Sequence, residues 1–300
     1  MVTGRLPRIP PALANRLRKL AAQYETPAFS ADDPIGCLRD APPEELETAA
    51  FLAASLSYGN RTQFIPKIRW ILDLAGSGGT RDWILSGHYA RTFHPVDCHS
   101  FYRLFSCAQM RVFLDKLRTI LQRHGTLGAC LRAAGATDGP SALRAICAAF
   151  GGRAAPIVPR DTTSACKRLC MFLRWMARNG SPVDFGIWSG WLDKATLVIP
   201  LDVHVLRQAN RLGLIRSRCA TMKTAEKLTQ QLSAVFPGDP CKGDFALYGL
   251  GIADSPVAAP TLPPELPPQA PPPTSLPTPL RAPPPPVPHC RTDSGSSRRP

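Results

Sequence analysis

Asp202 and Lys167 are the two residues whose setting could support chemistry. Asp202 ends a short apolar run and begins an amphipathic helical segment in IPLDVHVLRQANRLG. An aspartate at such a boundary caps the helix by accepting backbone N–H bonds, or it is a carboxylate held at the mouth of an active site. Lys167 lies 35 residues earlier, on the polar side of another expected helix, beside Arg168. Taken singly, these positions favour a helix cap and a solvated lysine.

Helices are the elements expected to position these two side chains. Apolar residues recur at helical spacing through most of the chain, and we find no alternating strands and no internal repeat. The sequence therefore predicts an all-α fold. The expected helical segments are 43–59, 63–76, 101–125, 140–152, 162–180, 181–192, 202–213, 222–236 and 241–251.

Composition divides the chain into two regions. Residues 1–253 read as an all-α domain, either undivided or made of two helical subdomains. Residues 254–300 are rich in proline, which lacks an N–H and fixes φ, so we expect a disordered or polyproline II tail there. Such a tail is either passive or a docking peptide for a proline-recognition module.

The chain is strongly basic. Lys and Arg number 36 against 22 Asp and Glu, a formal net charge of +14. Residues 254–300 hold four arginines and three acids, so almost all of the excess, +13, lies in the rest of the chain. Such a surface favours polyanions, above all DNA or RNA, although a merely solvated basic surface has the same composition.

The ten cysteines are scattered and none forms a C-x-x-C pair. Cys166 and Cys170 are four apart on one expected helix, where small apolar side chains suit a buried face. We therefore expect reduced thiols, no metal site and a cytoplasmic protein. The N-terminal residues have no apolar core of a signal peptide, and no apolar stretch is long enough to span a bilayer.

Three segments, in chain order, resemble the helix-hairpin-helix DNA glycosylases, the superfamily of endonuclease III and 8-oxoguanine glycosylase. LDVH at 201–204 resembles the catalytic aspartate segment, often Val-Asp-x-His. FLAASLSYGNRTQFIPKI resembles the early helix and loop that wedge into the duplex, and DFALYGLG the late helix. SACKRLCMFLRWMAR, VDFGIW and DFALYGLGI are closer still to an uncharacterised bacterial family, itself distantly similar to these glycosylases. The resemblance spans about 45–252.

The resemblance implies that Lys167 and Asp202 form the catalytic pair of a base-excision-type DNA glycosylase, with or without lyase activity, acting on damaged double-stranded DNA such as oxidised guanine. A neutral lysine amine would attack C1′ and form a Schiff base. The carboxylate would stabilise positive charge on the sugar or help to deprotonate the amine. No cofactor is expected, and no four-cysteine cluster follows residue 251, so we predict no iron–sulfur site.

The same resemblance implies DNA contacts and a base pocket. Asn60 and Arg61 are expected to fill the gap left by an extruded base, although SYGN also reads as a helix end and turn. Arg168 and His204 are expected as further DNA contacts. Aromatic residues between Lys167 and Asp202 are candidate walls of the pocket, with burial in the core as the alternative. The candidate pocket walls are Trp175, Phe185 and Trp188.

Two features depart from the familiar glycosylases. Their hairpin reads Leu-Pro-Gly-x-Gly before the lysine, whereas PIVPRDTTSAC precedes Lys167 and lacks the glycines that let backbone N–H groups approach a phosphate. The spacing of 35 residues exceeds the usual one and resembles that of archaeal 8-oxoguanine glycosylases. A non-catalytic nucleic-acid-binding protein of the same fold therefore stays open, as does an adaptor acting through the Pro-rich tail.

Overall fold

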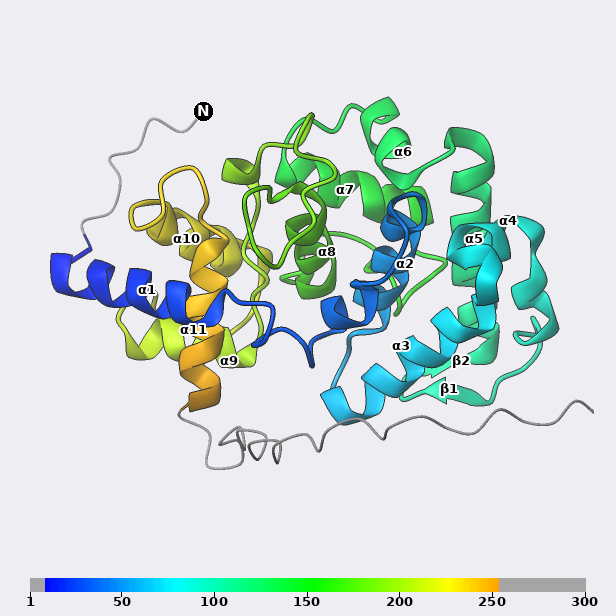
Figure 1. Cartoon of the computed structure of the whole chain (residues 1–300), viewed down its shortest axis with the longest axis horizontal. Coiled ribbons are helices and arrows are strands. Elements are labelled where there is room, and N and C mark those ends of the chain that lie inside the picture. The colour runs from blue at the N-terminus through cyan, green and yellow to red at the C-terminus, as the bar shows by residue number, and fades with distance from the viewer. Residues whose placement is uncertain (1–8, 254–300) are drawn as a thin grey trace, which may run out of the picture. The chain divides into compact units, whose positions relative to one another are not determined.

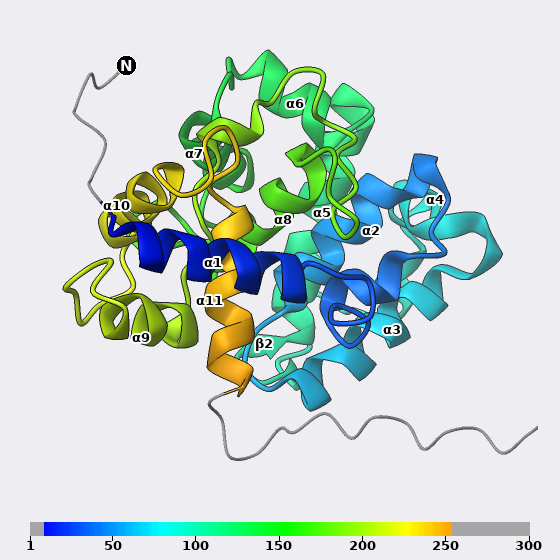
Figure 2. The same ribbon diagram turned by 60° about the vertical axis from the view of Figure 1, so that its left-hand side comes forward.

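A computed structural model describes residues 9–253, and these residues are mostly helical (Figures 1 and 2), as the sequence predicts. The expected Pro-rich tail lies outside the described residues. The helices are α1 (Pro11–Tyr24), α2 (Pro43–Leu56), α3 (Arg61–Ala75), α4 (Gly79–Ser86), α5 (Cys107–His124), α6 (Leu127–Ala133), α7 (Gly139–Phe150), α8 (Lys167–Ala177), α9 (Val203–Arg211), α10 (Met222–Ser233) and α11 (Lys242–Ala253). Short 3₁₀ turns add η1 (Pro34–Leu38), η2 (Gly76–Gly78), η3 (His88–Arg91) and η4 (Lys194–Thr196).

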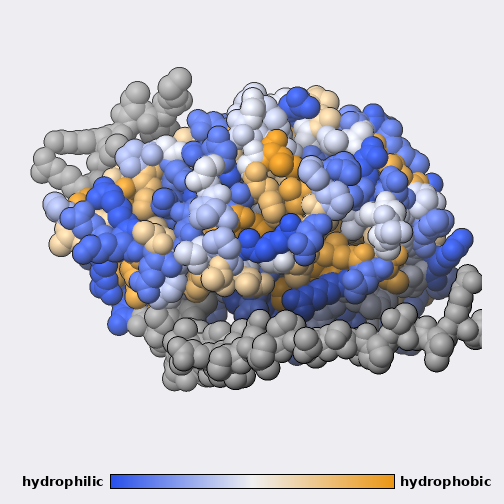
Figure 3. Space-filling view, in the orientation of Figure 1, coloured by the Kyte–Doolittle hydropathy of each residue, from blue (hydrophilic) through white to orange (hydrophobic). Residues whose placement is uncertain are grey.

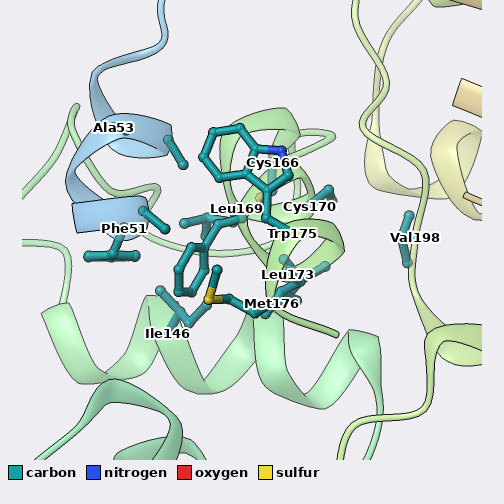
Figure 4. Close-up of a cluster of buried hydrophobic side chains, with 14 of the residues drawn as sticks. Phe51, Ala53, Ile146, Cys166, Leu169, Cys170, Leu173, Trp175, Met176 and Val198 are labelled. Carbon is teal, nitrogen blue, oxygen red and sulfur yellow. The ribbon is translucent and has the colours of Figure 1, made fainter. Parts of the chain in front are cut away.

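Helix α8 lies at the centre of the hydrophobic core (Figure 4). The predicted apolar face is confirmed, because all five of its members are buried. Trp175 on another side of the helix is also buried, so α8 is enclosed almost all round and contacts α2 and α7. The five residues of the predicted face are Cys166, Leu169, Cys170, Leu173 and Met176.

Several predicted helix boundaries are confirmed by their caps. α3 ends at Gly76 and α5 ends at Gly125, both with positive φ, which glycine adopts without a steric penalty. α5 begins with a capping box in which Ser106 Oγ accepts from Gln109 N, while Gln109 Oε1 accepts from Ser106 N.

Two predicted helical segments are wrong. Residues 101–125 do not begin as helix, because β1 (Ser100–Tyr102) and β2 (Phe105–Ser106) pair as an antiparallel hairpin before the capping box starts α5. Residues 181–192 form turns instead of a helix. Gly186 there has φ of +67°, and Ser181 Oγ accepts from the N–H groups of Val183 and Asp184, so local bonds replace the helical ones.

Helices from the two ends of the described chain pack together. α1 crosses α11, and α11 packs on α9 (Figures 1 and 2). α1, which the sequence reading did not predict, thereby brings the segment that follows it close to helices from the far end of the chain. No helix within residues 9–253 is both long and apolar enough to cross a membrane.

A buried ionic cluster fixes the C-terminal end of α8. Arg178, with 1% of its surface exposed, bonds to Glu25 at the end of α1, to Asp184 and to Asp239. Arg174, one turn earlier, pairs with Asp184 and with Asp244 on α11. The two guanidiniums therefore join α8 to α1, to α11 and to the turns after α8.

Arg178→Met should destabilise the fold strongly. The substitution leaves buried carboxylates without their shared cation, a loss that costs about 3–5 kcal/mol for a buried pair. Urea unfolding followed by circular dichroism measures the change in the free energy of unfolding. Arg18→Met, at a part-buried arginine that bonds Asn15 and a backbone carbonyl, is the matched control. A loss of less than about 1 kcal/mol at Arg178 would show that the cluster does not support the fold.

Candidate functional site

A cavity of about 700 Å³ lies where the first residues of α3, α8 and α9 meet α11 and the segment between α1 and α2. Figure 3 shows apolar surface exposed in patches across the middle of the face drawn in Figure 1, between hydrophilic residues. The cavity is lined by aromatic side chains as well as by charged ones. The aromatic residues are Phe29, Tyr58, Phe64, Trp175, Phe245 and Tyr248.

Lys167 and Asp202 meet in this cavity. Lys167 Nζ lies 2.9 Å from Asp202 Oδ2, with the lysine side chain 40% and the aspartate side chain 15% exposed. Asp202 Oδ1 accepts the backbone N–H groups of His204 and Val205 at 2.9 and 2.8 Å, so one oxygen caps α9 while the other binds the lysine. The aspartate is therefore both a helix cap and a carboxylate of the cavity.

The surroundings of Asp202 keep it ionised. Burial alone would raise its pKa, but the charge of Lys167 and the hydrogen bonds from Lys167 and Val205 outweigh burial and hold the pKa of Asp202 below its ordinary value. An ionised carboxylate beside an ammonium can stabilise developing positive charge on a ligand in the cavity.

The segments that precede α8 and α9 position Lys167 and Asp202. Val198, Ile199 and Leu201 are buried, and Ile199 N donates to Thr229 Oγ1 of α10, so the chain entering α9 is anchored on both sides of Pro200. On the other side, Ser164 forms an isolated antiparallel bridge with Thr221 just before α8. These contacts set the starts of α8 and α9 side by side.

Two further carboxylates enter the cavity, and the sequence reading missed both. Asp33 pairs with Arg61 at 2.8 Å, and Asp244 pairs with Arg174. Burial raises the pKa of Asp33 against the lowering effect of Arg61, and burial raises the pKa of Asp244 to about 6. Asp244 lies in the DFALYGLG segment, which drew attention as a motif but not for its acid.

The predicted DNA-contacting residues Asn60, Arg61 and His204 all line the cavity. Asn60 Oδ1 accepts from Thr62 N and so caps the start of α3. The helix end expected within SYGN is that of α2, whose C-cap is Ser57. Arg61 turns inward, where it bonds Asp33 and the hydroxyl of Tyr248. The sequence did not predict this pairing of Arg61, whose side chain was expected to enter the duplex. His204 lines the cavity with an exposed side chain.

Arg168 is held inside the fold. Its guanidinium donates to the backbone oxygens of Ser55 and Pro156 and lies over the ring of Tyr58. Burial lowers the pKa of this guanidinium to about 10. Arg168 therefore fastens α8 to α2 and to the loop before α8, a role that sequence spacing did not indicate.

Of the three predicted pocket walls, one lines the cavity. Trp175 does, and its Nε1 is buried with no hydrogen-bond partner in the described part of the chain. Phe185 and Trp188 do not line it. Trp188 packs edge-on against Phe172 and donates from Nε1 to Glu47 at 2.8 Å, so it lies in the core, the alternative that the sequence left open for these aromatic residues.

The β1–β2 hairpin supports the rim of the cavity. Tyr102 donates from its hydroxyl to Tyr58 O, and Arg103 lies over the Tyr58 ring. Gly59 has φ of +89°, a backbone conformation that L side chains rarely adopt, so this turn beside Arg103 favours glycine. Leu104, which follows Arg103 at the hairpin tip, is 63% exposed.

Within residues 9–253, no cluster of three or more His, Cys, Asp or Glu side chains has the arrangement of a metal site.

Two substitutions should separate the cap from the ion pair. Asp202→Asn keeps a capping side chain and should cost about 1 kcal/mol or less at pH 7, as expected for a partly exposed pair. Asp202→Ala also loses the cap, which adds about 1 kcal/mol. Urea unfolding of both variants and the unmodified chain measures these losses.

The loss in Asp202→Asn should depend on pH in one direction. Because folding lowers the pKa of Asp202, its charge stabilises the fold fully above the unfolded pKa of about 4, and this contribution disappears as the pH falls through the folded value. The stability difference between the unmodified chain and Asp202→Asn should therefore be full at pH 7 and should shrink as the pH falls below about 4. A difference that stays constant as the pH falls through this range would contradict the ion-pair assignment.

Comparisons with known proteins bear on the family alone. Neither a search of curated proteins nor one of solved structures found a match. A family model matches residues 33–253, more than half of the chain and a range that includes Asp33, Lys167 and Asp202. The chain therefore belongs to DUF2400, a family of proteins of unknown function.

Proposed function

We propose that this protein is a base-excision DNA glycosylase with lyase activity, acting on damaged bases through Lys167 and Asp202. The observation that carries the proposal is the 2.9 Å contact between Lys167 Nζ and Asp202 Oδ2 in an aromatic-lined cavity. The resemblance to helix-hairpin-helix glycosylases points to the same two residues, which lie 35 positions apart in the sequence.

The cavity has the size and walls that an extruded base needs. Ligand pockets of about 300–1,000 Å³ are typical of small-molecule sites, and about 700 Å³ lies within that range. A flipped base is held by stacking on aromatic or apolar side chains and by hydrogen bonds to its edge. Phe29, Phe245 and Tyr248 supply rings, and Asp33 with Arg61 supplies hydrogen-bonding groups.

Lys167 is the proposed nucleophile. Its amine, once neutral, forms a bond from Nζ to C1′ while the bond from C1′ to the base nitrogen breaks. The base leaves with the electron pair of that bond, and the proton lost from the amine passes to the departing base nitrogen. Opening of the sugar ring then gives a Schiff base between Lys167 and C1′.

Asp202 acts in this scheme mainly as a fixed negative charge. A carboxylate with a lowered pKa is a weak base, but it stays ionised and stabilises the positive charge that develops on the sugar as the base departs. Its second oxygen is held by two backbone N–H groups, so the carboxylate is already oriented before a ligand binds.

DNA would lie against the rim of the cavity. Asn60 and His204 line it with exposed side chains, and Leu104 projects from the neighbouring hairpin tip. Apolar side chains that enter a base step are a known device for holding a distorted duplex. Because Arg61 is bonded inside the cavity, Asn60 and Leu104 are better placed than Arg61 to fill the gap left by the base.

A non-catalytic nucleic-acid-binding protein is the second candidate, favoured by the chain before Lys167. Residues 151–166 connect α7 to α8 as irregular chain, in place of the short glycine hairpin of the familiar enzymes. Backbone N–H groups of that hairpin contact a phosphate in those enzymes, so this chain must hold DNA in another way.

Borohydride trapping separates the two candidates. With duplexes that each carry one damaged base, the unmodified chain should form a covalent complex with the correct lesion, because borohydride reduces a Schiff base to a stable amine. Lys167→Gln should abolish trapping and leave duplex binding within about threefold, since an amide cannot form a Schiff base. Denaturing electrophoresis detects the complex.

Two variants serve as controls for this experiment. Lys167→Arg keeps a cation beside Asp202 but cannot form the adduct, and Lys194→Gln changes a lysine that donates to Asn179 O outside the cavity. Trapping that persists in Lys167→Gln would overturn the nucleophile assignment. Duplex binding without strand scission or trapping on any lesion would favour the non-catalytic candidate.

Duplex binding should depend steeply on salt. Each neutralised phosphate contributes about −0.9 to the slope of log affinity against log salt concentration. The charge of +14 predicts several such contacts. Fluorescence anisotropy with an undamaged duplex at a series of salt concentrations measures the slope, and a flat dependence would exclude the DNA backbone as a partner.

A further inference from the structure

Cys147 and Cys166 bring two thiols together from different helices. Cys147 lies in the last turn of α7, and Cys166 is the N-cap residue of α8, at the far end of the irregular chain that joins the two helices. Both side chains are buried, and the two thiols form a hydrogen bond with each other. The fold therefore makes neighbours of two sulfur atoms that lie 19 positions apart in the sequence.

Cys166 is the member of this pair that borders the cavity. It is the only cysteine among the described residues that line the cavity, and it directly precedes Lys167. Cys147 on α7 and Cys170, one turn along α8, do not line the cavity. A small molecule that enters the cavity therefore reaches the thiol of Cys166 before that of Cys147.

The surroundings of Cys166 favour its thiolate form. The hydrogen bond from Cys147, with a smaller contribution from Ser164 Oγ at 3.6 Å, outweighs burial and lowers the pKa of Cys166. The same hydrogen bond and burial raise the pKa of Cys147, and burial raises the pKa of Cys170 and of Cys241. Because the thiolate is the nucleophilic form of cysteine, Cys166 is the reactive member of the pair and Cys147 carries the proton.

A purely structural role does not explain a cysteine at position 166. The residue has φ of +46°, in the left-handed region that glycine and asparagine adopt more readily. Its side chain makes no cap bond to α8, whereas residues that stabilise a helix start accept such a bond through a side-chain oxygen. What cysteine adds at this helix start is the chemistry of its sulfur.

Hydrogen peroxide would convert the pair into a disulfide in two steps. In the first, the Cys166 thiolate attacks a peroxide oxygen, the O–O bond breaks, and the departing hydroxide takes a proton from the solvent; Cys166 becomes a sulfenic acid. In the second, the sulfur of Cys147 attacks the sulfur of Cys166, the S–O bond breaks, and the departing hydroxide leaves as water with the Cys147 proton. The peroxide gains the two electrons that the two thiols lose.

Disulfide formation would change the chain that leads into Lys167. In the reduced protein the Cys166 thiol donates to Asp161 O at 3.4 Å. A disulfide sulfur carries no hydrogen, so this bond is lost on oxidation. The new covalent bond also ties the start of α8 to the last turn of α7. Oxidation therefore acts on the residues that directly precede Lys167.

We propose that Cys147 and Cys166 are a peroxide-responsive thiol pair, in which Cys166 is oxidised from the cavity and Cys147 then closes a reversible disulfide. One wall of the cavity is thereby a modification site. The pair is independent of the proposed function, because neither DNA nor Lys167 takes part in its reaction.

Peptide mapping of the full chain tests this pair. The reduced chain is treated with hydrogen peroxide at pH 7, the remaining thiols are blocked with N-ethylmaleimide, and the peptides are measured by mass spectrometry. A cross-linked peptide that contains Cys147 and Cys166 should form, lighter by two hydrogen atoms than the two reduced peptides together, and dithiothreitol should remove it. Cys170→Ser changes another buried thiol of α8 and should keep the cross-link.

Two variants assign the roles of the two thiols. Cys147→Ser keeps a hydrogen-bond donor beside Cys166 but has no second thiol, so Cys166 should remain a sulfenic acid and react with dimedone. In Cys166→Ser, labelling of Cys147 by dimedone should be at least about tenfold weaker, because the remaining thiol stays protonated and lies off the cavity. Circular dichroism of both variants checks that they fold.

A reversible cross-link confined to Cys147 and Cys166 supports the pair. Three results overturn it: oxidation of Cys166 to a sulfinic or sulfonic acid without a cross-link, equal dimedone labelling in the two serine variants, and survival of both thiols at peroxide concentrations that oxidise the exposed Cys98 and Cys219. Borohydride trapping at Lys167 succeeds or fails separately from each of these results, so failure of the proposed function leaves the thiol pair standing.

Discussion

The position of α8 depends on two buried guanidiniums one turn apart. Arg174 and Arg178 together face Glu25, Asp184, Asp239 and Asp244, which come from the end of α1, the turns after α8, and α11 or the chain just before it. Desolvating such groups is costly, and the cost is offset only if every partner is in place. The cluster therefore admits few alternative placements of α8, and Lys167 is the first residue of that helix.

The same cluster reaches the cavity through Asp244. Four carboxylates face the two guanidiniums and Lys242, which lies 3.4 Å from Glu25, so the cluster carries one excess negative charge when all are ionised. The pKa of Asp244, raised to about 6 by burial, identifies it as a group that takes up a proton readily. Asp244, which lines the cavity, can thus change charge at a pH of about 6, while Asp202 stays ionised.

Features governed by local chain physics could be predicted from the sequence. The buried face of α8, the end of α3 at Gly76 and the cap at Asp202 all follow from helical spacing and side-chain chemistry within a few residues. Features governed by distant partners could not. Ser181 and Pro182 looked like a helix start, yet Phe185 N and Gly186 N both bond Trp175 O, so contacts with α8 override the local signal.

The cavity residues also divide into those that the sequence indicated and those whose role depends on distant partners. Lys167 and Asp202 were named through a resemblance, while their 2.9 Å contact depends on the anchoring of both helix starts by buried chain. Asp33 had no signal, because ADDPIG reads as an ordinary polar turn. Its importance arises only when α1 packs on α11 and brings the following segment to Arg61 and Tyr248.

Neutralisation inside the cavity has a consequence for the basic surface. Since Lys167, Arg61 and Arg174 are each matched by a carboxylate, the net charge of +14 must be carried by side chains elsewhere on the chain. Attraction to a polyanion is long-ranged and insensitive to base sequence, whereas a charge-balanced pocket selects by hydrogen bonds and shape. Under the proposed function, the two tasks therefore fall to different surfaces: the outside of the chain would hold the nucleic acid backbone, and discrimination would be confined to the base that enters the cavity.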